Sequence, residues 1–314
     1  MAAGLAVGAL APLSGSWAST TAAVARIGGA DRIGTAIQIS GTTFPTRSAS
    51  AIVLTASDDF PDALAGAPLA AAKGAPLLLT EPDTLSGSTL LEMQRVAPTG
   101  ATVYILGGPG ALATTIDQQV AAAGYVPDRI AGLDRFDTSV KIAEALGSPS
   151  TVLLATGSNF ADALSAGPAA ASVHGAVLLT NADVVPPAVG LYLIGLPNPT
   201  VFTIGAAAGV AYPAGTRIAG TDRFVTSALV AQHFFPQPSV VGIATGYNYP
   251  DALAGAAAMG VMGGPVLLSD PFVLPAGTTY YLAVHKGTIV TAYLFGGVAS
   301  LSASIPFDVS AALS

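Results

Sequence analysis

One eleven-residue phrase occurs three times in the chain and constrains its fold more than any other feature. The copies are RIGGADRIGTA, RIAGLDRFDTS and RIAGTDRFVTS, and they begin at Arg26, Arg129 and Arg217. In each copy an Asp stands five residues after the first Arg, a second Arg follows that Asp directly, and a Thr comes three residues after the second Arg. Self-similarity at such intervals is the signature of a repeated structural unit.

Other signals recur in step with the phrase. The turn sequences SDDFPDAL, GSNFADAL and GYNYPDAL place Asp62, Asp162 and Asp251 at equivalent positions, and the centre of the next apolar run follows each of these by 16 residues. Because the interval is constant, each copy is expected to be one packed unit of ordinary small-domain size. The predicted organisation is a leader at residues 1–25 and modules at residues 26–128, 129–216 and 217–314.

The middle module is shorter than the first. Successive Asp-Arg pairs are 103 and then 88 residues apart, and the segment from Gly107 to Arg129 is ten residues longer than that from Gly205 to Arg217. We therefore expect the middle module to lack most of its last helix.

The composition excludes several classes of protein. Hydrophobic residues make up 52% of the chain and charged residues only 9%, which is the opposite of a disordered composition. The net charge is −7 and lysines and arginines form no cluster, so a nucleic-acid partner is not expected. Cysteine is absent, which rules out disulfides, thiolate metal sites and cysteine nucleophiles.

The amino terminus fits a secretory signal. An apolar run from Ala2 to Leu13 precedes the small residues Ser16 and Ala18, the pattern of a signal-peptide cleavage site. The most apolar later stretch, residues 252–268, is interrupted by Gly and Pro, so we predict no membrane span. The chain is expected to be secreted.

Each module shows alternating strand and helix signals. Short runs at residues 51–56, 151–156 and 240–245 are apolar on both faces, as central parallel strands are. A helix is expected after each Asp-Arg pair, and another after each DAL turn. Two further strand and helix segments complete the pattern, which predicts an α/β fold with a mostly parallel sheet. The helices after the DAL turns are expected to stop at Gly74, Gly175 and Gly263.

The ends of the predicted strands carry the candidate functional residues. In a parallel sheet the carboxyl ends of the strands share one edge, where α/β proteins bind ligands. Asp31-Arg32, Asp62, Thr80 and Gly107-Gly108 each stand where a strand passes into a helix. We therefore expect them to meet at one rim. The GGPG run at Gly107 is interpreted as a tight turn and not as part of a dinucleotide site.

The combined motifs resemble the cell-wall-binding repeat type 2 family. The phrase RIxGxDRxxT[AS], a strand ending in ATG, the DAL turn, an LLT strand and a strand ending in GG cover residues 26 to about 308. The resemblance implies Rossmann-like or flavodoxin-like modules about a pseudo-threefold axis, without a cofactor. It also implies noncovalent attachment of Gram-positive surface proteins to an anionic cell-wall polysaccharide.

The sequence departs from the family pattern in ways that differ between modules. Where the family has an aromatic residue and then Glu after the Asp-Arg pair, only the middle module keeps an acid, Asp137. The first DAL turn has Asp59 where the others have Asn159 and Asn248, and the second module has Gly205-Ala206 in place of a double Gly. The three rims are therefore not expected to bind equally.

Arginines of the phrase are the main candidates for ligand contact. Six of the eight arginines lie in the three phrases, and a guanidinium forks onto phosphate or carboxylate. The alternative is a set of internal ion pairs, with Asp31 holding Arg32 or Arg26 and with Asp62 capping its helix. The candidate polymer-binding residues are Arg32, Arg135, Arg223, Asn159 and Asn248. The candidate orienting or structural residues are Asp31, Asp134, Asp222, Asp62, Asp162 and Asp251.

Aromatic residues recur at the DAL turns as Phe60, Phe160 and Tyr249. They could stack on sugar rings or belong to the core. The sequence leaves both interpretations open.

Two other functions compete with polymer binding. The first is a surface-layer or envelope scaffold whose apolar faces pack against other copies or other envelope proteins. The second is a wall-glycan hydrolase that uses a carboxylate pair such as Asp58 and Asp62. His174, His233 and His285 occupy unrelated positions, so neither a triad nor a metal site recurs, and we predict a non-enzymatic protein without a metal.

Overall fold

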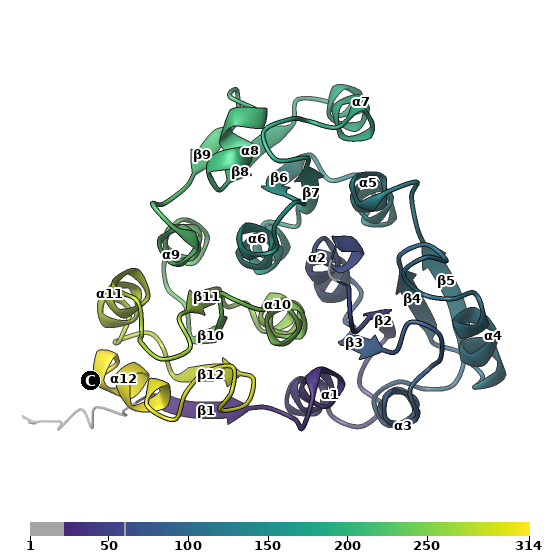
Figure 1. The fold of residues 1–314 in the computed structure, drawn as a ribbon, viewed down its shortest axis with the longest axis horizontal. Coiled ribbons are helices and arrows are strands. Elements are labelled where there is room, and N and C mark those ends of the chain that lie inside the picture. Colours follow the sequence, from purple (N-terminus) through teal and green to yellow (C-terminus); the bar gives the residue numbers. More distant parts are fainter. Residues whose placement is uncertain (1–21, 60) are drawn as a thin grey trace, which may run out of the picture.

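Three four-stranded parallel sheets surround a common axis (Figure 1). The computed structural model describes residues 22–59 and 61–314. Residues 1–21 of the predicted leader and Phe60 lie outside the described residues. Strands alternate with helices along the whole described chain, which confirms the predicted α/β fold.

The three sheets have the same topology. In spatial order, the first contains β3 (Leu77–Thr80), β2 (Ala51–Ala56), β4 (Thr102–Leu106) and β5 (Val126–Ile130). The second contains β7 (Ala176–Thr180), β6 (Thr151–Thr156), β8 (Thr200–Ile204) and β9 (Thr216–Ile218). The third contains β11 (Val266–Ser269), β10 (Val240–Thr245), β12 (Thr291–Phe295) and β1 (Ala23–Ile27). The first strand of each module lies between its second and third, as in flavodoxin-like folds, and a switch of strand order of this kind leaves a crevice at the carboxyl ends.

Each module contributes four α-helices. The helices that follow the Asp-Arg pairs are α1 (Arg32–Thr43), α5 (Arg135–Ala145) and α9 (Arg223–Phe234). The DAL turns lead into α2 (Gly66–Ala72, after a 3₁₀ turn at Pro61–Ala63), α6 (Ala161–Ser172) and α10 (Pro250–Met262). The outer helices are α3 (Gly87–Val96), α7 (Pro187–Gly195) and α11 (Ala276–Val284), and the last ones are α4 (Thr115–Ala122), α8 (Ala206–Ala211) and α12 (Ile305–Ala312). Across residues 22–59 and 61–314, no helix combines the length and hydropathy needed to cross a bilayer.

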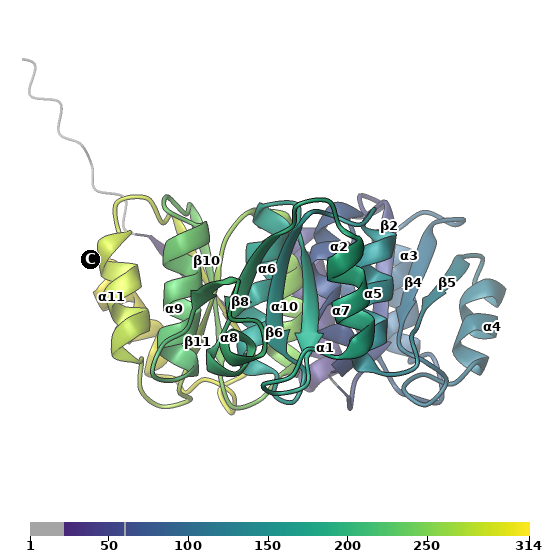
Figure 2. The same ribbon diagram turned by 90° about the horizontal axis from the view of Figure 1, so that it is seen from above.

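The strand that carries the first Arg of each phrase belongs to the preceding sheet. β5 pairs with β4, β9 pairs with β8, and β1 pairs with β12, so the amino-terminal strand completes the third sheet. The helix of the same phrase packs on the next sheet, as α5 does on β7. Each phrase therefore crosses from one sheet to the next, and the ring of three modules closes on itself (Figure 1). Figure 2 shows the same ring from the side, with most of the helices running along its axis.

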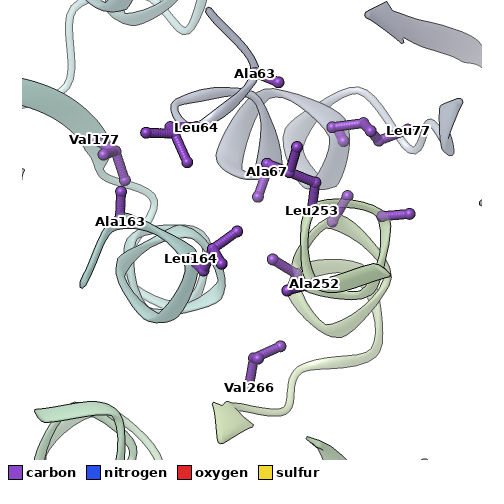
Figure 3. Packing of buried hydrophobic residues seen from close by; sticks show 14 of the residues in the cluster. Ala63, Leu64, Ala67, Leu77, Ala163, Leu164, Val177, Ala252, Leu253 and Val266 are labelled. Atoms are coloured by element: carbon purple, nitrogen blue, oxygen red, sulfur yellow. The ribbon is translucent and has the colours of Figure 1, made fainter. Parts of the chain in front are cut away.

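The modules share one central core. Helices α2, α6 and α10 pack on one another around the axis, and a single hydrophobic cluster includes the inner faces of all three sheets (Figure 3). Their contacting faces are built from Ala and Gly: a Cβ at Gly167 would lie 2.8 Å from that of Ala67, and one at Gly260 would lie 3.2 Å from that of Ala171. Three separate clusters fill the outer layers. Because the central cluster is common, the modules form one folding unit.

One detail differs from the sequence predictions. The left-handed residue that ends the second central helix is His174, with φ of 51°, so the predicted stop at Gly175 is wrong by one residue. Gly175 is required for another reason, since a Cβ there would lie 2.7 Å from the Thr151 carbonyl oxygen. Pro306 is the second residue of α12 and lies in the first turn, where its missing N–H has no intrahelical partner.

The middle module is shortened in the loop before its last helix and not, as predicted, mainly in the helix itself. Helix α8 has 6 residues, compared with 8 in α4 and in α12. It begins directly after Gly205, whereas loops precede α4 and α12. The middle module therefore lacks the loop that follows the third strand in the other two.

Phe295 makes a test of core packing possible. It is fully buried and occupies space that two glycines leave open: a Cβ at Gly242 would lie 2.5 Å from its ring, and one at Gly255 would also collide with it. The first module has Val53 and Leu106 at the positions of Gly242 and Phe295. Gly242→Val is expected to lower the free energy of unfolding by about 1–3 kcal/mol in urea melts, since overpacking forces strained rotamers.

Adding Phe295→Leu to Gly242→Val supplies the control. The smaller side chain removes the collision, so most of the lost stability should return, although Phe295→Leu alone should also be destabilising. Additive losses in the double variant would show that the two positions are not coupled.

Candidate functional site

Each phrase forms a turn that leads from a strand into a helix. The aspartates Asp31, Asp134 and Asp222 are N-caps of α1, α5 and α9. Oδ1 of Asp134, for example, accepts hydrogen bonds of 2.9 Å from the backbone N–H groups of Phe136 and Asp137. These bonds satisfy amides that a helix start otherwise leaves without partners. The position of each Asp is thus determined by the helix it begins.

The threonine of the phrase closes the same turn. Thr138 Oγ1 accepts a hydrogen bond of 3.1 Å from Gly132 N, and Thr35 and Thr226 make the same bond to Gly29 and Gly220. The backbone passes so close to the helix that a Cβ at Gly132 would collide with it. The Gly and Thr of the phrase are therefore explained by the turn itself.

The second arginine of each phrase reaches the end of the first strand of its own module. Arg32 Nη1 donates to Ser57 O at 2.8 Å, and Arg135 and Arg223 make the equivalent bonds to Gly157 O at 3.0 Å and Gly246 O at 2.5 Å. Arg32 is exposed, while Arg135 and Arg223 are half-buried. All three side chains are therefore at least partly exposed to solvent, and Nη1 of each is bonded to a strand-end carbonyl oxygen.

Aromatic rings of the DAL turns lie beside these arginines. The Arg32 guanidinium is 6.0 Å from the ring centre of Tyr249, and that of Arg223 is 5.8 Å from Phe160 and 5.6 Å from Tyr247. Phe160 and Tyr249 are themselves 6.0 Å apart, so turns from different modules meet near the axis. These contacts favour an internal role for Phe160 and Tyr249 over stacking on sugar rings. Phe60 lies outside the described residues.

A carboxylate from each DAL turn packs against the glycine that ends the third strand. Gly107 has φ of 110°, and a Cβ there would lie 2.7 Å from Asp62 Oδ2. Gly205 and Gly296 also have positive φ, and a Cβ on either would collide with Asp162 or Asp251. Glycine is therefore needed here both for its backbone conformation and for the space it leaves.

Three equivalent pockets result, one at each junction between modules. The first junction pocket, of about 210 Å³, contains Asp59, Asp62, Gly108, Asp134 and Arg135 among its lining residues. The second, of about 380 Å³, contains Asn159, Asp162, Ala206, Asp222 and Arg223. The third, of about 310 Å³, contains Asn248, Asp251, Gly297, Asp31 and Arg32.

These pockets correct the predicted grouping of residues. We expected Asp31-Arg32, Asp62, Thr80 and Gly107-Gly108 to meet at one rim. Asp62 and Gly108 instead share a pocket with Asp134 and Arg135, whereas Arg32 lies in the third junction pocket. The reason is the fourth strand, which carries each phrase into the preceding sheet. Thr80 lines none of these pockets; its buried hydroxyl donates to Thr84 O.

The candidate amides lie at the pocket edges. Asn159 Oδ1 accepts a hydrogen bond of 3.1 Å from Ala161 N, and Asn248 Oδ1 accepts one of 3.0 Å from Tyr249 N. Both side chains are exposed. Asp59 occupies the equivalent edge of the first junction pocket and adds a negative charge there.

The three carboxylates differ in their partners. Thr138 hydrogen bonds to Asp62, whose pKa is raised by burial, an effect that this bond and Arg135 oppose. Burial raises the pKa of Asp162 to about 6, with Arg223 acting against it. Asp251 receives a hydrogen bond of 2.7 Å from Ser300 Oγ. Ser300 was missed at the sequence level because its counterparts by position, Ala111 and Gly209, bear no hydroxyl.

The three sequence repeats match a known protein family. The sequence matches the family described as Cell wall binding domain 2 (CWB2) in three segments, residues 26–117, 129–210 and 217–306. The chain belongs to this family, and it contains three tandem copies of a cell-wall-binding domain.

Curated relatives share the repeats but are much longer. The N-acetylmuramoyl-L-alanine amidase LytC of Bacillus subtilis (strain 168) is 33% identical over 239 residues, which are 74% of this chain and 47% of the amidase. The amidase enhancer of the same strain is 29% identical over 290 residues, or 89% of this chain and 39% of the enhancer. The chain thus spans less than half the length of these two relatives.

Solved structures share the fold. Cwp8 from Clostridium difficile has a TM-score of 0.82 and 24% identity, covering 92% of this chain and 51% of Cwp8. Cwp6 from the same organism has a TM-score of 0.84 and 24% identity, covering 94% of this chain and 48% of Cwp6. These similarities confirm the fold.

Proposed function

We propose that the chain attaches noncovalently, and without catalysing a reaction, to an anionic polysaccharide of the cell wall through its three junction pockets. The observation that carries this proposal is the threefold recurrence of one partly or fully exposed arginine, bonded through Nη1 to a strand-end carbonyl oxygen, in a pocket between modules. An arginine side chain carries five N–H donors in a planar fork, which suits it to bind a phosphate or a carboxylate. The protein would then be secreted and reside at the cell surface.

The carboxylates in the pockets are compatible with an acidic ligand. The N-cap aspartates direct an oxygen at the backbone N–H groups of their helices, and the partial positive charge of a helix start offsets part of their own charge. The carboxylates of the DAL turns, Asp62, Asp162 and Asp251, pack against the glycines that end the third strands. The DAL carboxylates therefore form part of the pocket walls. In this proposal the ligand contacts are Arg32, Arg135 and Arg223.

Three weak sites suffice if they act together. A solvent-exposed ion pair contributes about 0–1 kcal/mol, so a single junction would not hold a protein on a wall. Linked binding to a repeating polymer can raise the avidity by roughly 10²–10⁴ when the spacing allows simultaneous contact. The closed ring keeps the three pockets at constant separations, which favours such binding.

Retention on purified walls tests the proposal. The chain should sediment with walls that carry their anionic secondary polymer, should be released as salt rises from about 0.05 to 1 M because charges are then screened, and should fail to sediment after the polymer is removed. Undiminished retention on stripped walls would contradict the proposal. Release of reducing sugar would instead support the hydrolase.

A scaffold role is the second candidate, favoured by the outer helices. Leu191 and Ile194 on α7 are 71% and 84% exposed, and Tyr280 on α11 is 62% exposed. Such side chains could pack against other copies or other envelope proteins. Ordered assembly in the absence of walls, seen by light scattering, would favour this role over polymer binding.

Asp59→Asn tests the inequality of the pockets. It gives the first junction pocket the amide that the second and third already have, and removes a negative charge from its edge. Retention on walls should strengthen by about two- to fivefold, the range that one surface charge contributes. A salt titration against the parent chain measures the change. Asp58→Ser is the control and should have a smaller effect on retention. Asp58 is an exposed neighbour that lines none of the three pockets.

A further inference from the structure

A fourth candidate site lies between strand β9 and helix α9 and shares no lining residue with the three junction pockets. Its key residue is Arg217, the first arginine of the third phrase. At the equivalent position Arg129 donates to the carbonyl oxygens of Gly107 and Leu112 and pairs with Asp117. Arg26 likewise donates to carbonyl oxygens of the loop after β12. In the first and third sheets this arginine is therefore used to hold the loop that follows the third strand.

The shortened middle module removes those acceptors from Arg217. Helix α8 starts directly after Gly205, and Gly209 packs against the aliphatic part of the arginine, where a Cβ would lie 2.8 Å from Cδ. Arg217 is exposed, and within the described part of the chain it has no hydrogen bond or ion pair. A guanidinium that is structural in two copies is thus available for a ligand in the third.

Two further polar side chains face the same groove. Arg217, Ile218, Ala219, Leu229, Gln232 and His233 line a space of about 400 Å³, which we call the β9–α9 groove. The His233 ring makes edge contacts with Phe202, at 5.3 Å, and Phe234, at 4.7 Å, and these two rings also contact each other. The His233 side chain is exposed to solvent. The groove combines a guanidinium, an amide and an imidazole from two elements.

The electrostatic surroundings suit an anion. No carboxylate lines the groove, and Asp222 is the only acid between residues 205 and 246 in a chain with a net charge of −7. Asp222 Oδ1 is directed at the backbone N–H groups of Phe224 and Val225 at the start of α9. At the position on α5 that matches Gln232, Glu144 supplies a carboxylate, which pairs with Lys141. Helix α9 lacks a negative charge at this position.

We propose that the β9–α9 groove is an anion-binding site that takes one phosphate group. Donors from three side chains, approaching from a strand and a helix, match a tetrahedral anion better than a planar carboxylate, which offers only two oxygens. The phosphate could be free or part of a phosphodiester. The site is independent of the three junction pockets and does not rest on the proposed function.

Imidazole resonances provide a direct test. Inorganic phosphate, dimethyl phosphate and acetate are titrated separately at pH 7 and constant ionic strength, and the ring signals of His174, His233 and His285 are followed by NMR. Phosphate should shift the His233 signals in a saturable way and leave His174 and His285 unchanged, and acetate should bind at least about tenfold more weakly. A response to dimethyl phosphate would identify a phosphodiester as an acceptable source. Equal shifts of all three rings, or none at His233, would overturn the proposal.

Variants separate the site from general charge effects. Arg217→Gln should weaken phosphate binding by about tenfold or more, and Gln232→Glu should do the same while Arg217 is intact, because a carboxylate then faces the ligand. Replacement of Arg32, Arg135 and Arg223 should leave the His233 response unchanged, so that failure here and failure of wall binding are distinguishable. Unaltered binding in both groove variants, with parental melting curves, would refute the assignment.

Discussion

The triple variant Arg32→Gln, Arg135→Gln, Arg223→Gln is expected to lose wall retention by roughly 100-fold or more. Each substitution removes the only cationic side chain from one junction pocket, as far as the described lining residues show. Because linking three sites raises the avidity above the affinity of each site, removing all three contacts eliminates this gain as well as the individual bonds. Single variants should lose far less, and Arg32→Gln, Arg135→Gln and Arg223→Gln need not be equal. Sedimentation with purified walls at several salt concentrations gives the measurement.

A matched control separates local contact from net charge. Arg47→Gln, Lys141→Gln and Lys286→Gln lower the net charge by the same amount at exposed positions that line none of the three junction pockets. This variant should retain most of its wall binding, and circular dichroism melts should show both triple variants folded. Equal loss in the two would mean that overall charge, and not the junction arginines, determines retention.

Asp162→Asn is expected to stabilise the protein near neutral pH. The Asp162 carboxyl has its pKa raised from 3.8 to about 6 by burial, so the folded state binds its proton more tightly than the unfolded state does. Its ionisation therefore lowers stability progressively as pH rises from about 4 to about 6, and the whole cost is present above that range. A neutral amide avoids this cost. The expected gain in the free energy of unfolding at pH 7.5 is about 2–3 kcal/mol, as an upper estimate.

The pH dependence provides the internal control for Asp162→Asn. At pH 4 the parent carboxyl is mostly protonated in the folded state, so the two proteins should melt at nearly the same temperature. Asp251→Asn is the contrasting variant, because Asp251 accepts a hydrogen bond from Ser300, which its amide oxygen can still accept. A stability difference for Asp162→Asn that is the same at pH 4 and pH 7.5 would show that ionisation is not its cause.

The repeat made most of the fold predictable. The central strands are apolar on both faces and the helices follow capping residues, so residues 51–56, 151–156 and 240–245 were assigned correctly from their pattern. The fourth strands were missed for a physical reason. β5 reads VPDRI and β9 has only three residues, and such polar or short edge strands lack the apolar pattern of a covered strand.

That omission also explains why the candidate sites were grouped wrongly. The sequence places Asp62 and Arg32 in one module, but strand pairing moves Arg32 to the preceding junction and brings Arg135 to Asp62. Covalent order cannot show which sheet accepts an edge strand. The N-cap role of the phrase aspartates, in contrast, was open to prediction, since Asp directly before a helix is a capping signal.

The left-handed residue at the end of α6 illustrates a limit of residue-type arguments. Gly175 was the natural choice because glycine usually occupies such a position. Alignment of the three copies by the following strand would have placed His174 opposite Gly74 and Gly263. Comparison of the three copies therefore predicts the left-handed position at residue 174, although the residue type there does not.

Hydrogen-deuterium exchange in the presence of soluble wall polymer tests the central claim most directly. If the anionic polymer binds at the module junctions, exchange should slow at the first turns of α1, α5 and α9 and at the DAL turns, and this protection should vanish in the variant without the three arginines. Protection confined to the outer helices α7 and α11, with unchanged exchange at all three junctions, would contradict the account.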